Sequence, residues 1–163
     1  MRQRKMVVGI DAGQKGGVAC LVDYQFVDGM RMPTKKISGK DVTNAAAVWH
    51  RITAWVEEYQ PDISVIGIEQ VHAFSGQGVS SSFTFGRQFG KVEAACEMFS
   101  WPTHYVPPSV WKKAYNLSSN KQASIDAAKL RFGEAIDPYL RFKADDGVAE
   151  AALIAAYVSE KFT

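Results

Sequence analysis

Short apolar runs rich in β-branched residues, bounded by glycine and polar residues, predict the strands of this chain. A glycine-rich turn at 13–17 separates the first two runs, and we expect the first three to pair as an antiparallel meander. The fourth run is uniformly apolar, which is typical of a strand buried on both faces of a parallel sheet. The predicted strands lie at residues 6–11, 17–22, 26–32, 63–68 and 103–106.

Apolar residues three or four positions apart predict the helices. In the first helix Val48, Ile52 and Trp55 recur at this spacing, and Asp41 is the expected N-cap. The segment 73–81 is polar and contains glycine, so we expect a loop there. The predicted helices span residues 41–59, 83–99, 108–115, 121–132 and 146–162.

The order of these elements indicates the α/β class, because three strands that can form hairpins precede strand–helix crossover units. A length of 163 residues favours one domain spanning 1–163. The order matches the ribonuclease H-like fold, with a central mixed five-stranded sheet flanked by helices. In that fold the first strand is central and the strand at 63–68 lies parallel beside it. Asp11 and Glu69 would then meet at one end of the sheet, where α/β sheets bind ligands.

Carboxylates stand where predicted elements begin or end. Asp11 and Glu69 each end an apolar run, while Asp146 and Glu150 are four residues apart and share one face of the last helix. Asp145 would be rotated by about 100° from Asp146 and is expected to do other work, such as capping. A carboxylate is costly to bury unless it is paired or holds a metal. The acids therefore predict a cation site, the alternatives being a turn Asp and acids that favour a helix N-terminus.

Basic and aromatic residues flank these acids in the sequence. Lys112, Lys113 and Lys121 are candidates for phosphate contact or for stabilising negative charge at a scissile phosphate; solvated lysines are the alternative. Arg87 can reach phosphates from its helix, and Phe74 can stack on an unpaired base unless it packs in the core. The net charge of +2 alone does not identify a nucleic-acid partner, but an acidic pocket with basic flanks suits a polyanion that meets a metal.

Cys20 and Cys96 both lie in apolar sequence, which predicts buried free thiols in a reducing compartment. No apolar run approaches the roughly 18 residues of a membrane-spanning helix, so no membrane contact is expected. These features favour a cytoplasmic protein.

Taken together, these motifs resemble the RuvC family of Holliday junction resolvases, and most closely its phage-type and prophage-type members. The matching pieces follow the family order over nearly the whole chain. They are Gly9-Ile10-Asp11-x-Gly13 with Gly16-Gly17, Met32-Pro33, Ile68-Glu69-Gln70-Val71, Ser81-Ser82-Phe83-x-Phe85-Gly86-Arg87 with Gly90, Pro107-Pro108-x-Val110-Trp111-Lys112-Lys113, Lys121, and Lys143-x-Asp145-Asp146-Gly147-x-Ala149-Glu150-Ala151-x-Leu153-Ile154-Ala155.

The resemblance implies a homodimer with two magnesium or manganese ions per active site, which nicks both sides of a four-way DNA junction. It also implies a bacterial protein, or a phage protein in the host cytoplasm. Asp11 and Glu69 correspond to metal ligands of the family. Typical bacterial members carry two Asp residues three apart on the last helix, and aligning the Ala-Leu-Ile-Ala tail puts Glu150 on the second. The first is then Asp146 or Asp145.

Two family lysines, one of them catalytic, fall near Lys112 and Lys121, with Lys113 as the alternative to Lys112. The expected function is a structure-selective, metal-dependent DNA endonuclease for Holliday junctions and other branched DNA. A ribonuclease H-like nuclease for RNA–DNA hybrids and a non-catalytic junction-binding protein are the alternatives. Gly-Ile-Asp-x-Gly also opens actin-like ATPases, but the chain is too short for their duplicated domains.

Overall fold

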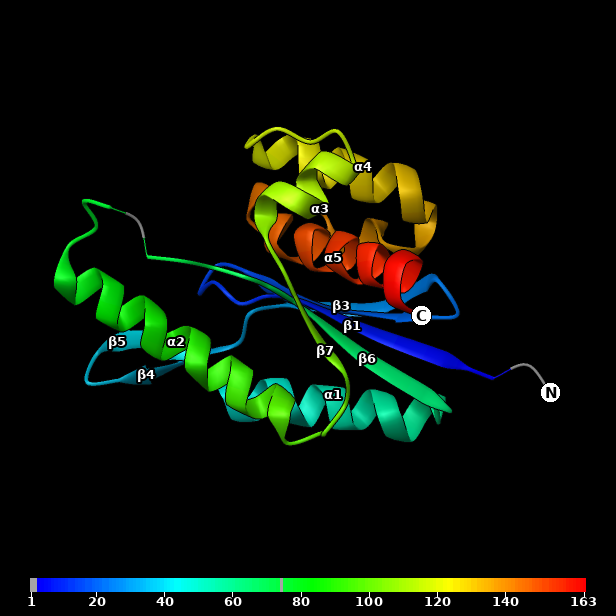
Figure 1. The fold of residues 1–163 in the computed structure, drawn as a ribbon, viewed down its shortest axis with the longest axis horizontal. Coiled ribbons are helices and arrows are strands. Elements are labelled where there is room, and N and C mark those ends of the chain that lie inside the picture. The colour runs from blue at the N-terminus through cyan, green and yellow to red at the C-terminus, as the bar shows by residue number, and fades with distance from the viewer. Residues whose placement is uncertain (1–2, 74) are drawn as a thin grey trace.

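The computed structural model describes residues 3–73 and 75–163 and is built on one five-stranded sheet (Figure 1). The strands lie in the order β3-β2-β1-β6-β7. Strand β1 pairs antiparallel with β2 and parallel with β6, so the first strand is central, as predicted. Their bounds are β1 Lys5–Asp11, β2 Gly17–Val22, β3 Gln25–Arg31, β6 Ile63–Glu69 and β7 Thr103–Val106.

Helices cover both faces of this sheet (Figure 1). One face packs against α3 (Pro108–Ala114), α4 (Lys121–Phe132) and α5 (Asp146–Phe162), and the other against α1 (Ala45–Tyr59) and α2 (Val79–Glu97). Successive side chains of β1 point to opposite faces of the sheet, so Val7 enters the core on one face while Met6 and Val8 enter the core on the other. Three 3-10 turns, Gly133–Ala135, Asp137–Tyr139 and Lys143–Asp145, connect α4 to α5.

Helix α5 crosses the sheet at very short range because glycines face it. A Cβ atom added to Gly9 on β1 would stand 2.0 Å from the Ala151 carbonyl oxygen, well inside van der Waals contact. Gly16 and Gly147 approach so closely that their backbones form an isolated β-bridge. These contacts fix the start of α5 beside the end of β1, where both elements carry acids.

The predicted start of the first helix at residue 41 is wrong, because a second small sheet occupies residues 34–43. Strands β4 (Thr34–Ile37) and β5 (Lys40–Thr43) form an antiparallel hairpin, so Asp41 lies in a strand. The N-cap of α1 is Asn44 instead, whose side chain accepts a hydrogen bond from the Ala47 N–H. Nearly all hairpin side chains are exposed, so no hydrophobic alternation signals it.

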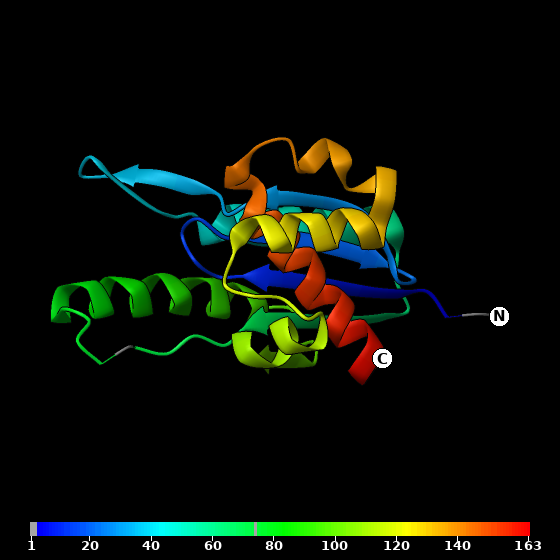
Figure 2. The ribbon, with the colours of Figure 1, turned by 90° about the horizontal axis from the view of Figure 1, so that it is seen from above.

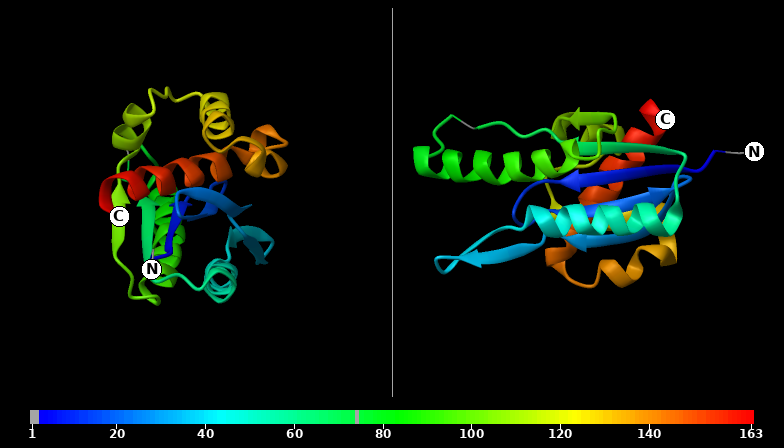
Figure 3. Two further views of the ribbon diagram at one scale, coloured as in Figure 1. Left: turned by 90° about the vertical axis from the view of Figure 1, so that its right-hand side faces the viewer. Right: turned by 90° about the horizontal axis from the view of Figure 1, so that it is seen from below.

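The hairpin and the first half of α2 extend beyond the sheet on the same side as the end of β1 (Figures 2 and 3). Helix α2 begins at Val79, within the segment expected to be a loop. The buried amide side chain of Gln88 on α2 accepts a hydrogen bond from the Thr43 N–H, joining the two extensions at their base.

Cys20 and Cys96 are buried free thiols, as predicted. Across residues 3–73 and 75–163, no helix combines the length and the apolar character needed to cross a membrane.

Candidate active site

Asp11 and Glu69 stand side by side at the end of the sheet. The parallel register pairs Ile10 of β1 with Ile68 of β6, so the next residue on each strand is an acid. Asp11 Oδ1 accepts a hydrogen bond from the Gly13 N–H at 3.2 Å, which orients the carboxylate at the start of the glycine-rich turn. The structure thus brings together the two acids that the sequence singled out first.

Asp146 and Glu150, on the first two turns of α5, complete the acidic cluster. Burial raises the pKa of Asp11 to about 7, helped by the negative charges of Glu69, Glu150 and Asp146. Burial likewise raises the pKa of Glu69 to about 7, with Glu150 adding to the shift. Four carboxylates from three elements therefore interact electrostatically, and the cluster is short of positive charge.

Three side-chain donors hold Glu69 and Glu150. The buried Trp111 indole donates a hydrogen bond from Nε1 to Glu69 Oε2 at 3.2 Å. Glu150 Oε1 accepts hydrogen bonds from Lys112 Nζ and from the Ser124 hydroxyl, each at 2.9 Å. Ser124 is completely buried on α4, so it is a fixed donor. The sequence did not identify the roles of Trp111 and Ser124, although Ser124 follows Lys121 by three residues and therefore lies on the same side of α4.

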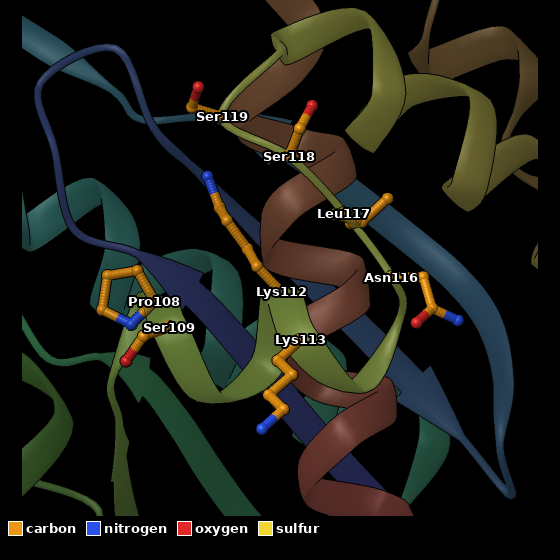
Figure 4. A pocket seen from close by; sticks show the side chains of 8 residues that line it. All are labelled: Pro108, Ser109, Lys112, Lys113, Asn116, Leu117, Ser118 and Ser119. Carbon is orange, nitrogen blue, oxygen red and sulfur yellow. The ribbon is translucent and has the colours of Figure 1, made fainter.

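Lys112 and Lys113 take opposite directions from α3 (Figure 4). Lys112 is largely buried and reaches Glu150, whereas Lys113 is exposed and points away from Lys112 along the wall of a surface hollow. Of the two alternatives left by the sequence, the geometry places Lys112 at the acids.

Lys121 forms the second lysine contact with the cluster. Its ammonium group lies 2.8 Å from Asp146 Oδ2, and this hydrogen bond raises the pKa of Lys121. The side chain is 66% exposed, while that of Asp146 is 9% exposed. Lys121 is thus at the mouth of the site and faces both the acids and the solvent.

Asp145 belongs to a different network. Its Oδ1 accepts a hydrogen bond from Arg31 Nε at 2.6 Å, and its Oδ2 accepts one from the Phe142 N–H at 2.7 Å. Burial alone would raise the pKa of this carboxyl, but these donors hold it below its usual value. Asp145 occupies the N-cap position of α5 but makes no side-chain cap bond to that helix; its carboxylate instead secures the 3-10 turn before α5 and leaves Asp146 and Glu150 to the cluster.

The donor chemistry of the cluster fits a hard divalent cation. Carboxylate oxygens are the ligands that magnesium and manganese prefer, and magnesium retains several waters, so few protein ligands are needed. The raised pKa values of Asp11 and Glu69 mark buried charge that a cation would neutralise. Within the described ranges, however, no three Asp, Glu, His or Cys side chains close around one point as a preformed metal cage. Lys112 and Lys121 supply the positive charge in this arrangement.

The remaining predicted DNA contacts lie outside this cluster. Arg87 is exposed on α2, and no ion pair links it to the acids within the part of the chain that the structure describes. Phe74 lies outside the described residues. The phosphate-contact roles of Arg87 and Lys113 therefore remain predictions.

Comparison with known proteins finds similarity in structure alone. No protein-family model and no curated protein sequence matches the chain. Among solved structures, Thermus thermophilus RuvC in complex with a Holliday junction substrate superposes with a TM-score of 0.64 at 16% identity, over 98% of this chain and 97% of that one. A second Thermus thermophilus RuvC structure gives a TM-score of 0.61 at 16% identity, over 97% of each chain. The chain therefore has the ribonuclease H-like fold of RuvC.

Proposed function

We propose that this protein is a divalent-metal-dependent endonuclease that resolves Holliday junctions and other branched DNA, as phage-type and prophage-type RuvC-like enzymes do. The observation that carries the proposal is the convergence of Asp11, Glu69, Asp146 and Glu150 at the end of the sheet, with Lys112 and Lys121 at its edge. The likeness to RuvC with a junction substrate supports the choice of DNA.

The four acids would hold two magnesium or manganese ions. When bound, such ions activate a water and stabilise the leaving 3′ oxygen of a phosphodiester. Trp111 and Ser124 donate the hydrogen bonds that orient Glu69 and Glu150, two of the four acids that would hold the ions. Lys121, at the solvent-exposed mouth, is placed to offset the negative charge that develops at the scissile phosphate.

Paired nicks require two active sites, and each chain carries one such cluster. We therefore propose a homodimer, which light scattering on the purified protein would test. A monomer in the presence of junction DNA would contradict this part of the proposal.

The substrate class is tested by offering labelled four-way junction, flap, linear duplex and RNA–DNA hybrid side by side, with and without magnesium. We expect magnesium-dependent cutting of the junction and none of the linear duplex. Preferential cutting of the hybrid would instead favour a ribonuclease H-like activity. Tight junction binding with no cutting under magnesium or manganese would indicate a non-catalytic binding protein.

A further inference from the structure

A basic hollow adjoins the acid cluster on the side of the glycine-rich turn. Its lining includes four positively charged side chains from four separate parts of the chain, and Asp146 is the acid among its lining residues. The four are Lys15, Arg31, Lys121 and Lys143. Segments distant in the sequence thus converge to concentrate positive charge next to the proposed site of cleavage.

Only half of that charge is compensated by acids. Arg31 is paired with Asp145 and Lys121 with Asp146. Lys15 and Lys143 are exposed, and neither forms an ion pair with any residue in the described ranges 3–73 and 75–163. The ammonium groups of Lys15 and Lys143 are therefore available to a ligand that enters the hollow. Their positive charge favours an anion.

We propose that this hollow binds a backbone phosphate of the DNA strand that is cut, adjacent to the phosphate at the acid cluster, with Lys15 and Lys143 as its principal contacts. The inference rests on the proposed function and extends it by assigning the path of the strand. Lys121 and Asp146 belong to both the hollow and the acid cluster, so the two sites are contiguous. A polymer of regularly spaced phosphates can occupy both at once, which a single small anion cannot.

The test compares Lys15→Gln/Lys143→Gln with the wild type and with Lys129→Gln/Lys161→Gln, a control that removes two exposed lysines outside the hollow. Binding of a fluorescent four-way junction is measured without magnesium over a range of salt concentrations, so that cutting does not interfere. Because each neutralised phosphate contributes about one unit to the salt slope of log Kd, the hollow variant, which loses one phosphate site, should lose about one unit of slope. We expect a roughly tenfold weaker Kd near physiological salt and little change for the control.

An unchanged slope, or an equal loss in the control variant, would overturn the assignment while leaving the proposed function intact if the wild type still binds and cuts. A wild type that neither binds nor cuts the junction would refute the proposed function, and this inference with it. Inorganic phosphate is the competing ligand. If the wild type binds inorganic phosphate and the hollow variant does not, while the two bind the junction with equal Kd and equal salt slope, the hollow is a small-anion site and the assignment to the strand is wrong.

Discussion

Asp145 and Asp146 are adjacent in the sequence, yet their carboxylates pair with different basic side chains: Asp145 with Arg31 Nε at 2.6 Å and Asp146 with Lys121 Nζ at 2.8 Å. The sequence left open which of the two belongs to the acid cluster. The helix start between them resolves it, because one residue of rotation directs Asp145 toward β3 and Asp146 toward α4. One acid is thereby structural, and the other is available for chemistry.

This division predicts different losses for two matched substitutions. Asp145→Asn removes the negative charge that Arg31 and the Phe142 N–H contact, so it should cost about 1–3 kcal/mol of unfolding free energy. Asp146→Asn loses only a pair with an exposed lysine and should cost less than about 1 kcal/mol, but it should abolish cleavage. Thermal melts and junction cleavage of both variants measure the contrast. Equal stability losses, or full cleavage by Asp146→Asn, would contradict the assignment.

Lys121→Ala should reduce cutting far more than binding. Its ammonium faces the acids, where charge develops during the reaction, so we expect a fall in cleavage rate on the order of 100-fold with a change in junction Kd below about threefold. Single-turnover cleavage and binding without magnesium give the two quantities. Equal losses in both would make Lys121 a docking residue only.

The metal-free protein should become less stable as pH rises. The pKa of Asp11 is raised to about 7 in the folded state, above its ordinary value near 4, so between these pH values the folded state holds more protons than the unfolded state. Stability is therefore greatest at the acidic end of this window and is lost as pH rises through 7. Asp11→Asn, which cannot ionise, should flatten the decline and stabilise the metal-free protein at pH 8 by on the order of 2 kcal/mol. Chemical denaturation at pH 5, 6, 7 and 8 in a chelator tests this, and a parallel decline in the variant would contradict it.

Close packing of α5 on the sheet depends on Gly9. Gly9→Ala would place a methyl group against the Ala151 carbonyl and the Ala155 backbone, so we expect a loss of at least about 3 kcal/mol or failure to fold. Gly86→Ala is the matched control, since no atom lies within 4 Å of the added carbon in the interior of α2. That change should stabilise by about 0.5–1 kcal/mol. Similar melting temperatures for the two variants would contradict the packing account.

Much of the fold could be predicted because its buried strands are apolar runs with clear ends. Asp11 and Glu69 were found for the same reason, since each ends such a run. The hairpin at 34–43 was missed because its side chains are almost all exposed and follow no hydrophobic period. The roles of Trp111, Ser124 and Arg31 depend on which elements pack together, so single positions in the sequence do not reveal them.

The most direct test of the central claim is magnesium-dependent cleavage of a synthetic four-way junction by the wild type, Asp11→Asn and Glu69→Gln. Both substitutions keep the shape of the side chain while removing one charge from the proposed metal site. The account predicts that the wild type cuts and that each variant loses at least about 100-fold in rate while still binding the junction. Full cleavage by either variant would show that the acids at the end of β1 and β6 do not carry the reaction.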